Sequence, residues 1–109
     1  MLRVEKKGAT SVATLLRDVR RHKENDEFSR ALAALVIVGD VVLDLGGKRL
    51  HRDNRGPLVH LNRRVSDAGC KLVICNVHPD LMEKIETGGM KSLLVITEDE
   101  EMAHVQLAA

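Results

Sequence analysis

Short apolar runs alternate with amphipathic stretches along the chain, and this alternation predicts its secondary structure. The apolar runs at residues 11–16, 41–45 and 71–75 are typical of buried strands. Residues 2–5 are shorter and partly alternating, so they predict an edge strand, and residues 92–96 predict a last strand. The chain therefore has the material for a sheet of four to five strands.

Apolar residues at helical spacing predict helices between these strands. After a charged, solvated loop at residues 17–23, a first helix begins at residue 25 or 26, where Asn or Asp can cap it, and buries Phe28. The β-branched residues 36–38 fit its end or a further strand.

The helix predicted at residues 57–68 has a clear amphipathic pattern. Pro57 fits its first turn, where no amide hydrogen bond is lost. His60, Arg63 and Arg64 fall on its other faces. Its predicted buried stripe consists of Leu58, Leu61, Val65 and Ala68.

Two further helices complete the predicted secondary structure. One is short and spans residues 80–87. The other begins near Thr97, which is followed three residues later by Glu100 in the pattern of a capping box. The residues predicted to pack inward are Leu81 and Ile85 in the first of these helices, and Met102 and Val105 in the second.

Strands that alternate with helices predict crossover connections and a largely parallel sheet. The first two strands are joined by a short turn and must therefore be antiparallel. The prediction is a single α/β domain over residues 1–109, with a mixed, mostly parallel sheet of four to five strands and helices packed on it. A chain of 109 residues can bury one core but not two.

Composition excludes several classes of function. The net charge of +1 gives no global attraction to nucleic acid or membrane, and Phe28, the one aromatic residue, provides no stacking platform for bases. The longest nearly apolar run, residues 31–39, is far shorter than the ~20 residues of a membrane span. Without an apolar signal segment at its start, the chain is expected in the cytoplasm.

No set of residues predicts an enzyme, a cofactor site or a metal site. The sequence contains neither a nucleophile elbow nor a glycine-rich phosphate loop, and its histidines lack metal-ligand spacing. Cys70 and Cys75 bracket a strand and are expected as reduced thiols. Asp44, inside an apolar strand, is expected to have a hydrogen-bonded structural role.

Three consecutive segments together resemble the STAS domain of anti-sigma-factor antagonists, stressosome scaffolds and sulfate-transporter tails. They are Val-Val-Leu-Asp-Leu-Gly-Gly at 41–47, Leu-Asn-Arg-Arg-Val-Ser-Asp-Ala-Gly at 61–69, and Lys-Leu-Val-Ile-Cys-Asn-Val-His-Pro at 71–79. The resemblance implies a non-enzymatic regulatory module whose partner is an anti-sigma factor or a switch-kinase-like protein. It also places a phosphoacceptor near Arg52 or Asp53, yet residues 46–65 contain no Ser, Thr or Tyr.

The loop that replaces the acceptor is strongly basic. Six Lys and Arg residues between positions 48 and 64, against Asp53, give it a local charge of +5 beside a helix start that already favours anions. The candidate partner-binding residues are Arg49, His51, Arg52, Asp53, Asn54, Arg55, His60, Arg63 and Arg64.

Other interpretations of this basic loop stay open. It is equally compatible with a merely solvated loop. It is also compatible with a sensor that holds an anionic metabolite or nucleotide at residues 48–64, or with a diverged scaffold or homodimer. Asp53 fits a helix cap better than a permanent imitation of phosphate, because one carboxylate lacks the charge and the oxygens of a phosphoryl group.

Overall fold

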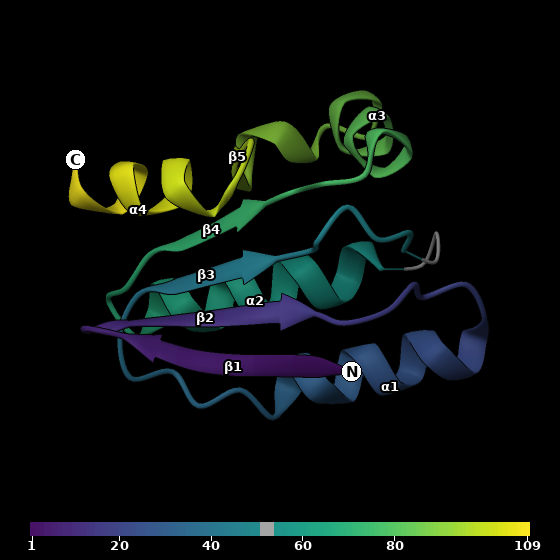
Figure 1. Cartoon of the computed structure of the whole chain (residues 1–109). Coiled ribbons are helices and arrows are strands. Elements are labelled where there is room, and N and C mark those ends of the chain that lie inside the picture. The colour runs from purple at the N-terminus through teal and green to yellow at the C-terminus, as the bar shows by residue number, and fades with distance from the viewer. Residues whose placement is uncertain (51–53) are drawn as a thin grey trace.

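The computed structural model describes residues 1–50 and 54–109 and contains one five-stranded sheet in the order β1-β2-β3-β4-β5 (Figure 1). β1 and β2 are antiparallel, and every later neighbour is parallel. This confirms the predicted mixed, mostly parallel sheet. The strands are β1 (Leu2–Lys7), β2 (Thr10–Leu15), β3 (Val41–Asp44), β4 (Leu72–Cys75) and β5 (Val95–Thr97).

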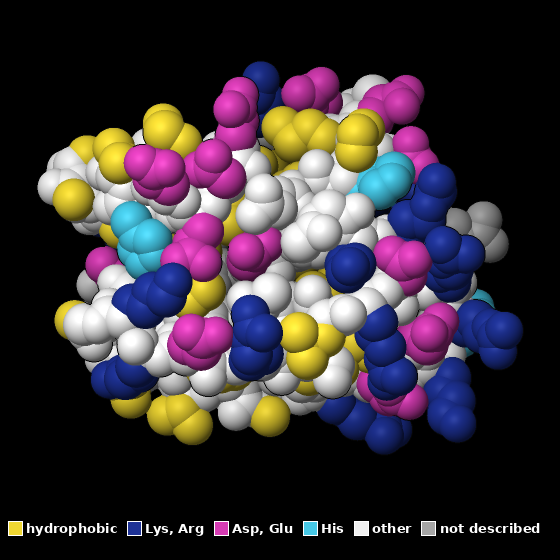
Figure 2. All heavy atoms as spheres, in the orientation of Figure 1, with side chains coloured by type: hydrophobic (Ala, Val, Ile, Leu, Met, Phe, Trp, Pro, Cys, Tyr) yellow, Lys and Arg dark blue, Asp and Glu magenta, His cyan; other side chains and the backbone are white. Residues whose placement is uncertain are grey.

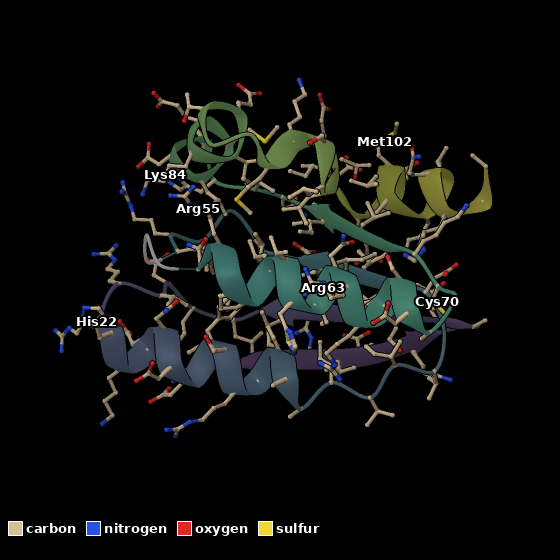
Figure 3. The ribbon with its side chains drawn as sticks, turned by 180° about the vertical axis from the view of Figure 1, so that it is seen from behind. His22, Arg55, Arg63, Cys70, Lys84 and Met102 are labelled. Carbon is tan, nitrogen blue, oxygen red and sulfur yellow. The ribbon has the colours of Figure 1, made fainter. Side chains whose placement is uncertain are left out.

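Helices cover both faces of the sheet. Seen from behind in Figure 3, α1 and α2 lie in front of the strands, while α4 lies beside β4 and β5 in Figure 1. The helical elements are α1 (His22–Ala33), α2 (Arg55–Asp67), α3 (Pro79–Thr87), the 3-10 turn η1 (Met90–Ser92) and α4 (Glu100–Ala108). None of the helices in the described part of the chain has the length and apolar character to span a bilayer.

The alternation of side chains along the strands divides the core in two. On β3, Leu43 packs toward α1 and α2, whereas its neighbour Val42 packs toward α4. The first cluster contains Phe28 from α1 and Leu61 from α2, both within 1% of full burial. The apolar residues of β3 and β4, which lie within the predicted strands at 41–45 and 71–75, are thus buried on both faces, as their continuous apolar character indicated.

The first helix begins earlier than its apolar pattern indicated. α1 starts at His22, so the end of the predicted 17–23 loop is helical. The Glu24 carboxylate accepts hydrogen bonds from the backbone amides of Arg20 and of the N-cap residue Arg21, at 3.0 and 3.1 Å, and so fixes the start of the helix. Residues 36–38 form neither helix nor strand.

The C-terminal helix departs from the prediction in its cap and its buried face. Asp99, not Thr97, caps α4, because its carboxylate accepts from the Met102 amide at 2.8 Å. Met102 and Val105 are 48% and 59% exposed, and Ala103 faces the sheet instead.

Two smaller corrections concern the ends of predicted elements. Ala68 is exposed and forms the C-cap of α2, so the buried stripe of that helix ends at Val65. The last strand begins at Val95, later than expected, because η1 occupies Met90–Ser92.

Candidate functional site

The carboxyl ends of β2, β3 and β4 lie at one edge of the sheet, and the loops that follow them meet there. The chain leaves β3 through Gly46 and Gly47, whose φ angles of 59° and 69° are in the left-handed region that glycine tolerates. It leaves β4 through Asn76, with a φ of 53°. In Figure 1 these loops and the start of α3 lie at the same end of the sheet.

Asp44 joins the β3 and β4 loops at this edge. Its carboxylate accepts from the Gly46 amide at 2.8 Å and from the Asn76 side-chain amide at 2.9 Å. Both bonds hold turns in left-handed conformations, and this confirms the predicted structural role of Asp44. The Oδ1 atom of this carboxylate is therefore engaged in holding the two loops.

Arg49 connects three loops of the same edge. Its backbone amide donates to Asp18 at 2.8 Å, its carbonyl accepts from the Val19 amide at 2.7 Å, and its guanidinium reaches Asp80 at 3.2 Å. The hydrogen bond from the Arg49 amide is the main reason why the pKa of Asp18 is lowered. The β2–α1 loop, the β3–α2 loop and α3 are therefore held together through one residue.

Cationic side chains gather around these loops. Figure 2 shows Lys and Arg concentrated at the end of the molecule where the loops meet. We call this surface the basic edge. Its described members are Arg20, Lys48, Arg49, Arg55 and Lys84. The carboxylates that oppose them locally belong to Asp18 and Asp80, which pair with Arg20 and Arg49.

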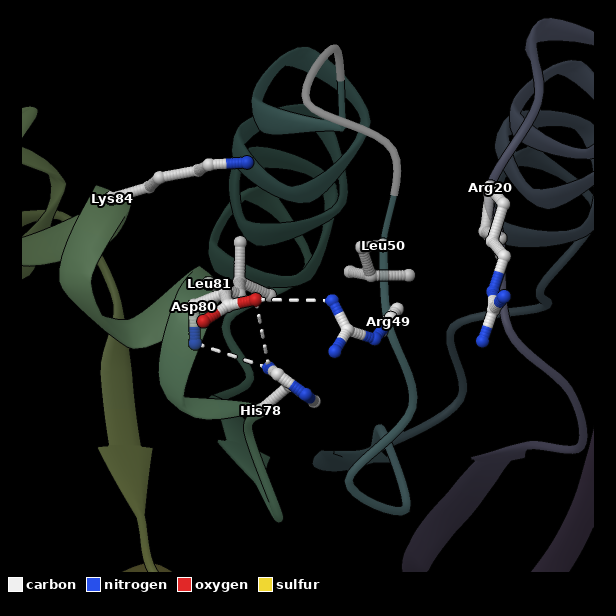
Figure 4. A pocket seen from close by; sticks show the side chains of 8 residues that line it. Arg20, Arg49, Leu50, His78, Asp80, Leu81 and Lys84 are labelled. Atoms are coloured by element: carbon white, nitrogen blue, oxygen red, sulfur yellow. Dashed lines mark hydrogen bonds and ion pairs between the residues drawn. The ribbon is translucent and has the colours of Figure 1, made fainter.

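The basic edge encloses a hollow of about 620 Å³ (Figure 4). Arg20 approaches from the β2–α1 loop, Arg49 from the β3–α2 loop and Lys84 from α3. Its lining is completed by Val19, Leu50, His78, Asp80 and Leu81. The sequence analysis did not identify Arg20, His78 or Lys84 as site residues, because they lie on separate segments that only the fold brings together.

Four of the predicted partner-binding residues are accessible. Arg49, Arg55, His60 and Arg63 are all exposed, although they face different directions. Arg55 lies beside Gly88 at the end of α3, whereas His60 lines a shallow groove between α1 and α2. Arg63 projects from the outer surface of α2 in Figure 3.

The other predicted site residues are placed differently. The Arg64 guanidinium donates to the carbonyls of Leu32 and Leu35 at 3.0 and 2.6 Å, so it caps the C-terminal end of α1. Asn54 is the N-cap residue of α2 and is 1% exposed, so its side chain lies away from the surface that the prediction assigned to partner binding. His51, Arg52 and Asp53 fall outside the described residues.

The two cysteines are free thiols in different environments. Cys70 is half-buried, while Cys75 is buried beneath α4. Burial, reinforced by the negative charge of Asp44, raises the pKa of Cys75 to about 12. A thiol of this kind is protonated and inert at neutral pH. Within residues 1–50 and 54–109, no three His, Cys, Asp or Glu side chains converge to form a metal site.

Comparison with solved structures shows the STAS fold. The anti-sigma-factor antagonist (STAS) domain protein of Planctomyces limnophilus matches with a TM-score of 0.83 and 17% identity, over 99% of this chain and 98% of that one. RsbS of Moorella thermoacetica, in a serine-to-glutamate variant, matches with a TM-score of 0.74 and 13% identity, over 98% and 94% of the two chains. The phosphorylated Bacillus cell fate determinant SpoIIAA matches with a TM-score of 0.66 and 14% identity, over 97% and 98%. No protein-family model and no curated protein matches the sequence.

Proposed function

We propose that this chain is a non-enzymatic regulatory module of the cytoplasm that binds a partner protein through the basic edge and the exposed face of α2. The partner would be an anti-sigma factor or a related switch kinase. The fold supports this proposal, because two of the similar structures are an anti-sigma-factor antagonist domain protein and a cell fate determinant. The observation that carries it is the convergence of five cationic side chains at the edge where α2 begins.

The charge of this surface defines the kind of partner that would fit. Arg55 and Arg63 are exposed on α2, and neither guanidinium forms an ion pair with another residue in the described part of the chain. Guanidinium groups of this kind form bidentate contacts with carboxylates. A partner with an acidic surface would therefore gain steering and orientation from the basic edge, and its affinity would fall as salt is added.

The sequence of the β3–α2 loop defines how the interaction would be controlled. The phosphorylated SpoIIAA structure shows that this fold can carry a phosphoryl group. Residues 46–65 of this chain have no hydroxyl side chain that could accept one as an ester. We therefore propose that the interaction is not switched by serine phosphorylation at this loop, and that abundance or a second partner controls it.

The proposal is tested by titrating purified anti-sigma factors and serine kinases encoded near this chain's gene against the full chain. The double variant Arg55→Glu/Arg63→Glu should weaken the binding that is found by roughly tenfold or more, because it reverses two contacting charges. The matched control is Lys6→Glu/Lys91→Glu, which makes the same charge change on β1 and η1. Equal loss in both double variants would overturn the basic edge as the docking surface.

A second arm tests the control mechanism. Adding Mg-ATP to the complex of the full chain with a kinase partner should leave its affinity unchanged. Release of the chain, together with a phosphoryl group mapped to residues 46–65, would overturn the proposed absence of a switch. Failure of every candidate to bind would overturn the proposed function itself.

A further inference from the structure

We infer that the hollow beside Arg49 is a binding site for a small organic dianion, in the form of a phosphate monoester or a dicarboxylate. The hollow lies within the basic edge, between the β2–α1 loop, the β3–α2 loop and α3, and shares Arg20, Arg49 and Lys84 with it. It can be measured on the isolated chain and does not depend on a partner protein.

Three cations from three separate segments converge on this hollow. Figure 4 shows Arg49 between Lys84, which approaches from α3, and Arg20, which approaches from the β2–α1 loop. Among the described lining residues, the carboxylate is that of Asp80, whose side chain is 64% exposed. The excess of positive charge within the lining matches a ligand group with two negative charges.

The cations differ in how far they are already engaged. Arg20 pairs with Asp18 at 3.0 Å and Arg49 pairs with Asp80 at 3.2 Å. The Lys84 side chain forms no hydrogen bond or ion pair with the other described residues, and its ammonium group projects over the hollow. A lysine at the mouth of a hollow is a point charge suited to phosphate or carboxylate, and the flanking guanidinium groups supply directed donors.

The rest of the lining favours an organic ligand over a bare ion. Val19 and Leu81 are at most 4% exposed and belong to the main core, so they give the hollow a fixed apolar wall. Leu50, packed against the same core, extends this wall. The volume of about 620 Å³ lies within the range of roughly 300–1,000 Å³ typical of small-molecule sites. A compact ligand with one charged end and a short carbon body would contact both the cationic side chains and the apolar wall.

The Asp80 carboxylate occupies the position beside Arg49 that a ligand anion would take, and would therefore compete with the ligand. Its carboxylate reaches the Arg49 guanidinium at 3.2 Å and lies 3.8 Å from Nδ1 of His78. The His78 ring is fixed, because its Nδ1 accepts a hydrogen bond from the Asp80 amide at 3.1 Å. A ligand anion would replace the Asp80 carboxylate at Arg49, and the exposed carboxylate would turn into solvent.

Calorimetric titration of the full chain with glycerol 3-phosphate and with succinate tests the site, with glycerol as the uncharged control. Saturable binding of either anion with no response to glycerol is expected. Lys84→Ala and Arg20→Ala should each weaken binding roughly tenfold, since each removes a charge-assisted contact. Lys91→Ala, which removes an equally exposed charge outside the hollow, should have little effect.

The variant Asp80→Asn provides a test in the opposite direction. It removes the competing carboxylate and should tighten anion binding, whereas damage to the fold would weaken it. Binding of glycerol 3-phosphate, of succinate or of both supports the site. The relative affinities then identify the preferred anion. Absence of saturation at millimolar anion, or equal losses in Lys84→Ala and Lys91→Ala, would overturn it.

Discussion

The two faces of the sheet are built from alternate residues of the same strands, yet they are covered in different ways. Toward α1 and α2, the strands meet large side chains such as Phe28 and Leu58, both completely buried. Toward α4, the described cluster is small and contains Val12, Val42, Val73, Cys75 and Ala103. Burial of apolar area dominates stability, so the first face should contribute most of the free energy of folding.

The second face relies more on charged groups. Lys7 of β1 reaches Glu100 of α4 at 2.6 Å, and Glu100 also contacts His104 at 3.0 Å. The contact between Lys7 and Glu100 links α4 to β1, and it adds to the small apolar cluster beneath the helix. Solvent-exposed ion pairs contribute little to stability, so α4 should open more readily than α1 or α2. We therefore expect the face covered by α1 and α2 to supply most of the stability and the face covered by α4 to open locally.

The largest expected effect comes from the first face. Phe28→Ala removes a fully buried ring and should lower the free energy of unfolding by about 3–5 kcal/mol, measured by denaturant titration. Leu107→Ala is the comparison on the second face, where Leu107 is only partly buried, and it should cost clearly less. Equal losses in the two variants would contradict the difference between the faces.

A smaller effect should follow acidification. The hydrogen bond from Lys7 holds the pKa of Glu100 below its ordinary value of 4.5. The folded state therefore binds fewer protons than the unfolded state in this range, and stability is lost as pH falls below about 4.5 through the folded pKa.

The matched variants Glu100→Gln and Glu101→Gln isolate this contribution, since Glu101 is exposed and lies next in sequence. Glu100→Gln should lower the thermal midpoint at pH 7, and its difference from wild type should shrink as the solution is acidified. A difference that is constant with pH, or one shared by Glu101→Gln, would show that the Glu100 charge does not fasten α4.

The smallest effect is a change in thiol labelling. In the folded chain at neutral pH, Cys70 should react with a thiol reagent, while Cys75, with its pKa raised to about 12, should react only after unfolding. Glu100→Gln should accelerate the labelling of Cys75, because α4 covers it, and Glu101→Gln should not. Rapid labelling of Cys75 in wild-type protein would mean that α4 does not protect this face.

The sequence predicted those features that depend on local pattern. The continuous apolar runs indicated β3 and β4, and the spacing of Leu58, Leu61 and Val65 indicated α2. The pattern failed at α4, where a small residue, Ala103, packs on the sheet and larger apolar residues face solvent. Close packing of the helix on the sheet favours a small side chain at this position. A prediction based on hydrophobicity alone assigns the larger apolar residues to the buried face.

The candidate site was less predictable, because its contacts join distant segments. Arg64 looked like another basic surface residue, but its guanidinium caps α1, some thirty positions earlier in the chain. Arg20, His78 and Lys84 became neighbours only through the meeting of three loops. The charge and exposure of Arg55 and Arg63 were therefore predictable, whereas the hollow depends on contacts between segments that are distant in the sequence.

The position of Arg49 has a thermodynamic consequence. Any molecule that draws its guanidinium from Asp80 changes the energy of a junction that also holds the β2–α1 loop through Asp18 and Val19. If a small anion in the hollow alters the affinity for a protein at the neighbouring surface by some factor, that protein must alter the affinity for the anion by the same factor. Reciprocity of this kind would give the chain an input through a small molecule, where residues 46–65 offer no hydroxyl for phosphorylation.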